Sequence, residues 1–516
     1  MNLAQLISTP QIDYPAILPV LIVLSAACVS VLFEAFLPRP QRWGAQVGLS
    51  LIAIVVSGVA LGLYVRSSPK VGLTTLSGAI SIDKPALFLW GTLLALGFAA
   101  VLLIADRSVE RGGAFVAEAS IRPGTVQDQA QARTAVMQTE VFPLTLFALG
   151  GMMTFCAAND LLTMFIALEV LSLPLYLMCG LARRRRLLSQ ESAVKYFLLG
   201  AFSSAFFLYG LALLYGYANS VKLADIANAA AGSDRSDTLL FAGLGLLVVG
   251  LLFKGSVGPF HTWTPDVYQG APTPVTAFMA ACTKVAAFGG ILRVLTVGFE
   301  STSWQWRGVL WAVAIVSMAI GAVLGITQTD VKRMIAYSSI AHAGFLLVGT
   351  IAMTGPGLSG TMFYLLAYGF TTLAAFGVVS LVRDSSGEAT HLSAWAGLAK
   401  RSPVVAAVFT FLLLALAGIP LTSGFVGKFV VFSAALQDGM APLVVIALVF
   451  SAVAAFFYLR VIVLMYFSQP SPEGPTVSVP GMLTTTAITL GVVVTLVLGV
   501  VPSIALNWAN AGGFAF

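Results

Sequence analysis

The sequence predicts an all-α polytopic membrane protein with about fourteen transmembrane helices, and three observations support that class. Of its 516 residues, 58% are hydrophobic and only 9% are charged, whereas soluble domains carry about 25% charged residues. The apolar runs are about 20 residues long, which suits a helix that crosses a bilayer rather than the alternating strands of a β-barrel. The basic residues behind the net charge of +6 lie between these runs. They therefore indicate membrane topology rather than nucleic-acid binding.

The expected helices follow from the apolar runs, taken in order along the chain. Residues 106–137 form the longest polar loop, and residues 468–480 form a connector rich in Pro and Gly. The predicted spans are residues 15–36, 45–65, 84–105, 138–157, 161–182, 192–217, 238–257, 273–297, 308–327, 332–353, 359–382, 403–434, 441–467 and 481–502.

The distribution of Lys and Arg predicts the orientation, because cytoplasmic loops hold an excess of them. No basic segment precedes the first apolar run, so we expect a retained first helix with its N-terminus outside. Fifteen basic residues then fall inside: Arg39, Arg42, Arg107, Arg111, Arg122, Arg133, Arg183, Arg184, Arg185, Arg186, Lys332, Arg333, Arg383, Lys400 and Arg401. Six fall outside: Arg66, Lys70, Lys84, Lys222, Arg235 and Arg307. If the count had missed one helix, every later loop would be assigned to the wrong side, and the excess of basic residues on one side would be lost. The observed excess therefore supports fourteen helices with both termini outside.

Several ionisable side chains are expected at membrane depth or at a helix break, where a charge costs at least about 3 kcal/mol. Because of that cost, each one is a candidate functional residue. The candidates are Glu169, Lys254, His261, Lys284, His342 and Lys428. A packing role remains an alternative for His342, and Arg460 could equally be structural. Lys195 is expected to reach the surface from a helix end, and Arg293 is expected to anchor the outer end of its helix.

The candidates repeat along the chain at nearly constant separations. These are 173 residues from Glu169 to His342, 174 from Lys254 to Lys428, and 176 from Lys284 to Arg460. Gly and Pro interrupt the apolar run beside both Lys254 and Lys428. We therefore expect two inverted five-helix repeats, helices 4–8 and 9–13, with broken helices 7 and 12. Their bounds are 138–298 and 304–467, between an N-terminal three-helix segment with its inside loop (1–137) and a connector with the final helix (468–516).

Glutamate, lysine and histidine in this order indicate proton transfer through the membrane. Burial favours neutral lysine, while a nearby carboxylate favours the charged form, so a pair such as Glu169 and Lys254 can load and release a proton. Broken helices expose carbonyls and admit water, and histidine can bridge such groups near neutral pH. The predicted order is Glu169 with Lys254, then His261 or Lys284, then His342, then Lys428.

Five segments resemble the antiporter-like subunits of proton-pumping NADH:quinone oxidoreductases. The most characteristic is LLFKGSVGPFHTWTPDVYQGAPTPVTAFMAACTKVAAFG, which begins at Leu251. ANDLLTMFIALEVLSLPLYLM, ESAVKYFLLGAFSSAFFLYG, ITQTDVKRMIAYSSIAHAGF and GIPLTSGFVGKFVVF are similar to the same family. The resemblance covers about residues 140–467. The SSIAHAG segment, the helix count without a lateral C-terminal helix, and Lys428 in place of the M-type glutamate favour the N-type branch.

The resemblance implies a proton-translocating membrane-arm subunit in a bacterial plasma membrane. It implies that Glu169 pairs with Lys254, that Lys284 is the central lysine, that Lys428 faces the exit, and that His261 and His342 link them. No cofactor or metal is expected on this chain, because NADH, FMN, iron–sulfur clusters and quinone act in other subunits of such complexes.

The expected partners are the M-type and K/J/A-type membrane neighbours and the lipid bilayer, with no nucleic acid. The alternative is a subunit of an Mrp-type multisubunit cation/proton antiporter, whose subunits share the Glu and Lys pattern. A passive scaffold is disfavoured, because it would not need charges at membrane depth. The loop 106–137 is longer than the family resemblance implies.

Overall fold

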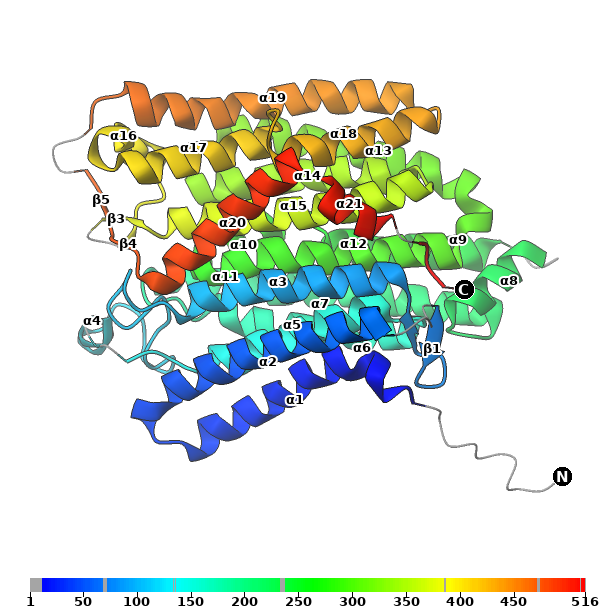
Figure 1. The fold of residues 1–516 in the computed structure, drawn as a ribbon, viewed down its shortest axis with the longest axis horizontal. Coiled ribbons are helices and arrows are strands. Elements are labelled where there is room, and N and C mark those ends of the chain that lie inside the picture. Colours follow the sequence, from blue (N-terminus) through cyan, green and yellow to red (C-terminus); the bar gives the residue numbers. More distant parts are fainter. Residues whose placement is uncertain are drawn as a thin grey trace.

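The protein is a bundle of long helices that run nearly parallel or antiparallel along one axis (Figure 1). The computed structural model describes residues 12–67, 72–132, 134, 136–232, 237–384, 387–470, 474–510 and 512–515. Its helices are α1 (Tyr14–Phe36), α2 (Arg39–Ser67), α3 (Lys84–Ala105), α4 (Val126–Ala132), α5 (Val141–Ala157), α6 (Leu161–Cys179), α7 (Arg186–Ala218), α8 (Leu223–Gly232), α9 (Thr238–Lys254), α10 (Trp263–Gly270), α11 (Thr273–Phe278), α12 (Lys284–Arg293), α13 (Ser303–Thr327), α14 (Val331–Ile351), α15 (Gly355–Val379), α16 (Leu398–Arg401), α17 (Pro403–Ala417), α18 (Ser423–Gln437), α19 (Ala441–Phe467), α20 (Met482–Val500) and α21 (Ser503–Ala509).

The multi-pass helical class is confirmed. Among the described residues, eleven helical segments are long and apolar enough to cross a membrane. Four more apolar helices are shorter, namely α5, α9, α17 and α18. Every predicted span corresponds to one helix or to consecutive helical segments. The count of fourteen spans and the repeat boundaries stay predictions.

Two predicted breaks appear where Gly and Pro interrupt the apolar runs. In the seventh predicted span (238–257) the helix α9 ends at Lys254, and α10 follows beyond the predicted span, whereas the twelfth span divides into α17 and α18 after Ala417. The eighth span is less regular than the sequence suggests. In it, π-helical turns at Met279–Thr283 and Val294–Gly298 flank α12.

Loops predicted to lie on one side of the membrane meet at one end of the bundle. That end holds α4, α16 and the small sheet of β3 (Val382–Asp384), β4 (Gly387–Glu388) and β5 (Thr476–Val477), at the left of Figure 1. Glu110 there accepts hydrogen bonds from Arg184 at 2.8 Å and Arg383 at 2.7 Å. Burial raises the pKa of Asp106 at this end, but hydrogen bonds from Ser108 and Thr484 outweigh it and hold the pKa below its usual range.

The opposite end holds the loops predicted to lie outside. The hairpin of β1 (Leu73–Thr75) and β2 (Ile80–Ile82) forms a backbone β-bridge to Ala158, and the backbones of Asp160 and Lys222 form another. Helix α1 begins at this end, which lies at the right of Figure 1. The grouping of loops therefore agrees with the predicted topology, while the side that each end faces stays a prediction. Arg133, Lys70 and Arg235 lie outside the described residues.

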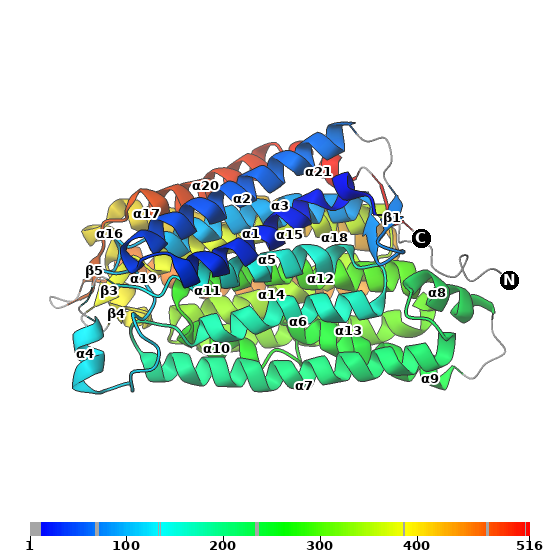
Figure 2. The same ribbon diagram turned by 90° about the horizontal axis from the view of Figure 1, so that it is seen from below.

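Four helical segments form the buried centre. The apolar parts of two segments are wholly buried: the segment from α11 to the end of the second π-turn, and helix α14. The apolar parts of α3 and α15 are nearly all buried. Figure 2 shows α12 and α14 between the layer that contains α2 and α20 and the opposite face, along which α7 runs. Gly321 permits a close approach of α13 to α14, because a Cβ there would lie 2.3 Å from the Ala341 nitrogen. Of the candidate lysines, this centre carries Lys284, which therefore lies away from the outer surface of the bundle.

Candidate functional site

Lys254 ends α9 at the first break and is 4% exposed. Its Nζ donates to the Ser172 hydroxyl at 2.7 Å and to the Tyr196 hydroxyl at 3.1 Å. The ammonium also lies 5.5 Å from the Tyr176 ring centre and 5.1 Å from that of Tyr196. Oxygen acceptors and ring faces both stabilise a buried cation.

Glu169 lies on α6, three residues before Ser172, so the two share one face of the helix. Its side chain is half-buried, and its Oε1 atom is buried with no hydrogen-bond partner in the part of the chain that the structure describes. One of the two direct partners of Lys254 is therefore a serine on the same helix face as the predicted glutamate. Sequence reasoning missed Ser172.

Lys284 begins α12 directly after the first π-turn and is 2% exposed. Its Nζ donates to the Ser339 carbonyl oxygen on α14 at 2.6 Å. The ammonium lies 5.4 Å from the centre of the Tyr368 ring on α15. Single π-turns occur often at functional sites, because they alter the direction of the side chains that follow.

His342 is buried between three tyrosines. Its Nδ1 lies 2.7 Å from the Tyr364 hydroxyl, and its Nε2 lies 3.4 Å from the Tyr458 hydroxyl. The Tyr368 ring centre is 4.9 Å from that of His342. A neutral imidazole has one donor and one acceptor nitrogen. His342 can therefore link two hydroxyl networks and also pack as part of the core.

Lys428 lies beside the second break and is 6% exposed. Its Nζ donates to the carbonyl oxygens of Leu416 at 3.2 Å and Ala417 at 2.8 Å, and to the Ser451 hydroxyl at 2.9 Å. The two carbonyls belong to the last turn of α17, whose partial negative charge favours a cation. Gly418 follows with φ +88°, and a Cβ there would lie 3.1 Å from Nζ. The break therefore brings backbone acceptors to the lysine.

Three of the predicted residues form one contact series through aromatic rings. Tyr368 lies against both Lys284 and His342, Phe345 lies 5.8 Å from His342 between ring centres, and Lys428 lies 5.0 Å from the Phe345 ring centre. We call Lys284, Tyr368, His342, Phe345 and Lys428 the central row. Lys254 belongs to a separate cluster, in which the Tyr196 ring stacks on Trp263 at 4.6 Å.

His261 and Arg460 lie outside the central row. His261 is half-buried between α9 and α10, with its ring 6.4 Å from that of Tyr337. Arg460 is exposed on α19 and donates to the Ile326 carbonyl at 2.9 Å, near the end of α13. The separation that relates Lys284 to Arg460 therefore joins a buried residue to an exposed one. For Lys284 and Arg460, the repeated separation along the sequence therefore does not predict whether the side chain is buried.

Arg293 lies on the same helix as Lys284 and is also fully buried. Its guanidinium donates to both carboxylate oxygens of Asp83, at 2.8 and 2.9 Å, and to the Cys156 carbonyl at 2.9 Å. The residue thus anchors the helix through a buried ion pair inside the protein. Lys195, by contrast, is partly exposed and pairs with Glu191 and Asp266, both at 2.7 Å.

The hydroxyl partners of the lysines were missed by sequence reasoning. Serine and tyrosine occur throughout these apolar helices, so composition does not separate the functional ones. One signal was present, because Tyr364, Tyr368 and Thr372 recur every four residues and so share one face of α15.

Comparisons with known proteins agree on the family. The sequence model described as "NADH:quinone oxidoreductase/Mrp antiporter, TM" matches residues 158–455. The chain is 78% identical over 511 residues to "NADH-quinone oxidoreductase subunit N" of Saccharopolyspora erythraea, which covers 98% of this chain and 99% of the relative. It is 58% identical over 504 residues to the protein of the same name from Acidothermus cellulolyticus, with 98% and 96% covered.

Solved structures match over nearly the whole chain. A chain of "Respiratory complex I from Thermus thermophilus with bound Aureothin" has a TM-score of 0.76 at 32% identity, with 96% of this chain and 100% of that chain covered. A chain of the Mrp complex from Dietzia sp. DQ12-45-1b has a TM-score of 0.78 at 21% identity, with 96% of each covered. The Mrp likeness shows the fold alone, whereas the relatives with high identity carry the N-subunit name. The chain therefore belongs to the family of NADH-quinone oxidoreductase N subunits.

Proposed function

We propose that this chain moves protons across the membrane as a subunit of an NADH-quinone oxidoreductase. The observation that carries the proposal is the central row, in which two buried lysines and a histidine succeed one another inside an apolar bundle. Such residues are costly at membrane depth and are kept there chiefly for ion or proton transfer.

The proposed path assigns a proton-carrying role to each lysine. Lys254 and Glu169 exchange protons near the first break, Lys284 holds the proton at the centre, and His342 passes it on. His261 is a second linking group near the first break. Lys428 releases the proton at the second break, where the chain interruption permits water to approach.

Electrostatic repulsion couples successive steps along this path. Like charges repel more strongly in the low-dielectric interior of the bundle than in water, so a positive charge at one position of the row disfavours positive charge at the others. Arrival of a proton at Lys284 therefore favours its loss from Lys428. The hydroxyl and carbonyl acceptors stabilise each ammonium without fixing it, since they carry no full negative charge.

The finer assignments complete the proposal. The end that holds α4 and α16 faces the cytoplasm of a bacterial cell, and both termini lie outside the plasma membrane. The neighbours are the M-type and K/J/A-type membrane subunits. NADH, FMN, iron–sulfur clusters and quinone act in other subunits, and this chain contributes translocation. The repeats 138–298 and 304–467 form its two halves.

Purification of the intact assembly separates this proposal from the Mrp alternative. We expect the tagged chain, isolated gently from its native membrane, to co-purify with flavin- and iron–sulfur-containing subunits and to support quinone reduction by NADH. Isolation with antiporter-like chains alone, without redox activity, would instead assign the chain to a cation/proton antiporter.

Replacement of Lys284 by Met is expected to lower proton translocation by about 10²-fold or more, as removal of a positioned proton-transfer group does. Met keeps much of the side-chain volume but has no exchangeable proton. The measurement is proton uptake into vesicles that contain the reconstituted complex, together with the rate of NADH oxidation.

Lys195→Met is a matched control, because it removes a cation from a helix surface, where such pairs contribute at most about 1 kcal/mol. We expect this variant to pump normally. Normal pumping by Lys284→Met would disprove the proposed role of the central lysine.

A further inference from the structure

An apolar groove lies between α2, α3 and α21, near the end of the bundle that holds the β1–β2 hairpin. Its lining comes from residues 54–66 on α2, residues 91–98 on α3, and Trp508 on α21. Figure 2 shows α2 along the edge of the bundle, and Val55 in the groove wall is 50% exposed. The volume is about 460 Å³, within the range of about 300–1,000 Å³ that is usual for a small-molecule site. We call this the lateral groove.

The lateral groove has the length of one membrane leaflet. Ile54 and Arg66 on α2 are its first and last lining residues on that helix, and they are twelve residues apart. At a rise of 1.5 Å per residue this separation is about 18 Å, whereas half of the hydrocarbon core of a bilayer is about 15 Å. Arg66 is exposed in the last turn of α2. The groove therefore runs from the membrane interface to about the middle of the bilayer, which suits one acyl chain lying along the helix.

Glycines and a tryptophan give the groove its hollow shape. Gly58 and Gly62 face open space, because a Cβ at either position would meet no neighbouring atom within 4 Å. Gly91 lets the Trp508 ring approach α3, since a Cβ there would lie 2.5 Å from that ring. The Trp508 ring also packs against Phe88, with 4.8 Å between ring centres. Trp508 thus closes one side of the groove, at the interface level where tryptophan is enriched in membrane proteins.

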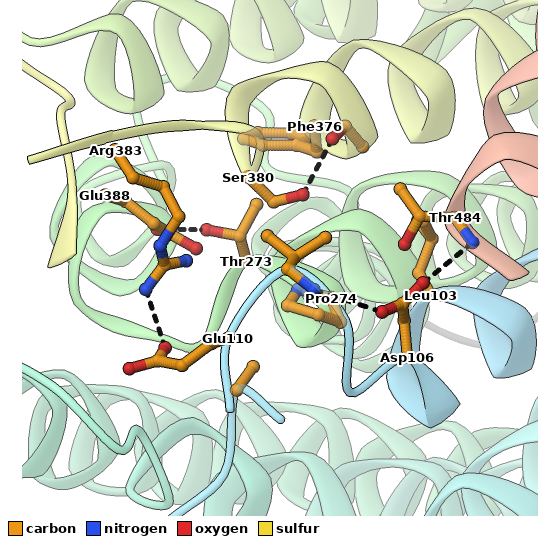
Figure 3. A pocket seen from close by; sticks show the side chains of 13 residues that line it. Leu103, Asp106, Glu110, Thr273, Pro274, Phe376, Ser380, Arg383, Glu388 and Thr484 are labelled. Carbon is orange, nitrogen blue, oxygen red and sulfur yellow. Dashed lines mark hydrogen bonds and ion pairs between the residues drawn. The ribbon is translucent and has the colours of Figure 1, made fainter. Parts of the chain in front are cut away.

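Arg66 places a positive charge at the mouth of the groove. It is the single charged side chain among the described residues that line it, and in the described part of the chain it forms no ion pair. The arginines at the opposite end of the bundle differ. Figure 3 shows Arg383 directed at Glu110, to which it donates at 2.7 Å, and Arg184 donates to the same carboxylate. Those charges are balanced within the protein, whereas the charge of Arg66 is open to an anion from outside.

We propose that the lateral groove binds one anionic phospholipid, with an acyl chain along α2 and the phosphate on the Arg66 guanidinium. Apolar contact alone does not select a ligand here, because the surrounding lipid tails are as apolar as the groove. The charge selects the headgroup, since a planar guanidinium matches a phosphate through two parallel hydrogen bonds. The site goes beyond the proposed function, because no residue of the central row takes part in it.

Quenching of Trp508 fluorescence tests the site in the whole complex, because bromine on an acyl chain quenches a tryptophan that the chain contacts. The complex is reconstituted in phosphatidylcholine vesicles with rising fractions of brominated phosphatidylglycerol, which is anionic, or of brominated phosphatidylcholine. The chain has eight Trp residues, so a parallel Trp508→Phe series isolates the Trp508 signal by difference. We expect phosphatidylglycerol to quench it at roughly one-fifth of the fraction that phosphatidylcholine needs, as one basic residue near a membrane surface implies.

Gly58→Phe fills the groove, and Gly48→Phe is its matched control. Both glycines lie on α2, and an added Cβ at either would meet no neighbouring atom within 4 Å, but Gly48 does not line the groove. We expect Gly58→Phe to abolish the fivefold preference and Gly48→Phe to retain it. Subunit composition after purification measures whether each variant assembles.

Arg66→Gln tests the charge without filling the groove. We expect it to lose the preference for phosphatidylglycerol, whereas Lys222→Gln, which removes a cation at the same end of the bundle but outside the groove, should keep it. A preference that survives Arg66→Gln would overturn the assignment.

Two results with the unaltered complex would also overturn the site. Equal quenching by the two brominated lipids would mean that the groove meets bulk lipid only. Absence of quenching by either lipid would mean that another occupant covers the groove, such as a helix of a neighbouring subunit or an uncharged isoprenoid lipid. Neither result bears on proton translocation, which the Lys284→Met variant tests separately.

Discussion

Replacement of Lys428 by Met is expected to lower proton translocation by about 10²-fold or more while the chain stays folded and assembled. The ammonium of Lys428 is the last cation of the central row, and its acceptors are two carbonyls at the end of α17 and the Ser451 hydroxyl. Met fills similar space but cannot carry a proton between His342 and the break. Proton uptake by vesicles that contain the complex measures the loss, and subunit composition after purification measures assembly.

Lys428→Arg supplies the decisive comparison. Arginine keeps a cation that can reach the Leu416 and Ala417 carbonyls, but it does not lose its proton in proteins. We therefore expect it to assemble as well as the unaltered chain and to pump as poorly as Lys428→Met. If Lys428→Arg still pumped, only a fixed positive charge would be needed at this position. The proposal that Lys428 releases protons would then be wrong.

Removal of the Asp83 carboxylate is expected to give the largest loss of stability. The Asp83→Ala variant leaves the guanidinium of Arg293, which is 0% exposed, without its bidentate partner. Breaking one side of a buried ion pair costs about 3–5 kcal/mol, because a charge stays buried and unpaired. Thermal unfolding of the solubilised complex, followed together with the yield of intact assembly, measures this loss.

The double variant Asp83→Leu with Arg293→Met tests the stated cause. Removing both charges leaves no buried charge unpaired, but the Ala86 N–H loses its acceptor and the Cys156 carbonyl loses its donor, so we expect the double variant to recover part of the stability lost in Asp83→Ala. Glu191→Ala is the control, since its pair with Lys195 is exposed and contributes at most about 1 kcal/mol. A double variant as unstable as the single one would show that shape, rather than charge, dominates at this position.

Much of the fold was predictable, because a bilayer imposes strict limits on sequence. A crossing helix needs about 20 apolar residues, and Lys and Arg collect in loops on one side. The breaks beside Lys254 and Lys428 were predictable from Gly and Pro within apolar runs. The burial of Lys284 followed from the cost of a charge in lipid, which a lysine in the middle of a span avoids only inside the bundle.

The neighbours of these residues were not predictable from the same sequence. Helices that are apolar all round show no periodicity that separates a buried face from a lipid-facing one. For this reason the exposure of Arg460 and the complete burial of Arg293 were missed. The Tyr and Ser partners of the lysines come from helices distant in the chain, so no local pattern reveals them. The contact of Lys428 with α17 is local, but its geometry depends on the left-handed turn at Gly418.

The bonds from Lys428 to Leu416 and Ala417 also constrain biogenesis of the protein. A nascent α18 that entered hydrocarbon alone would present an ammonium with no acceptor, which is costly. Its two carbonyl acceptors belong to the helix made just before it, and they become available once α17 has formed its last turn. We therefore expect residues 403–437 to enter the bilayer as one unit, in which the carbonyls of the earlier half accept hydrogen bonds from the cation of the later half.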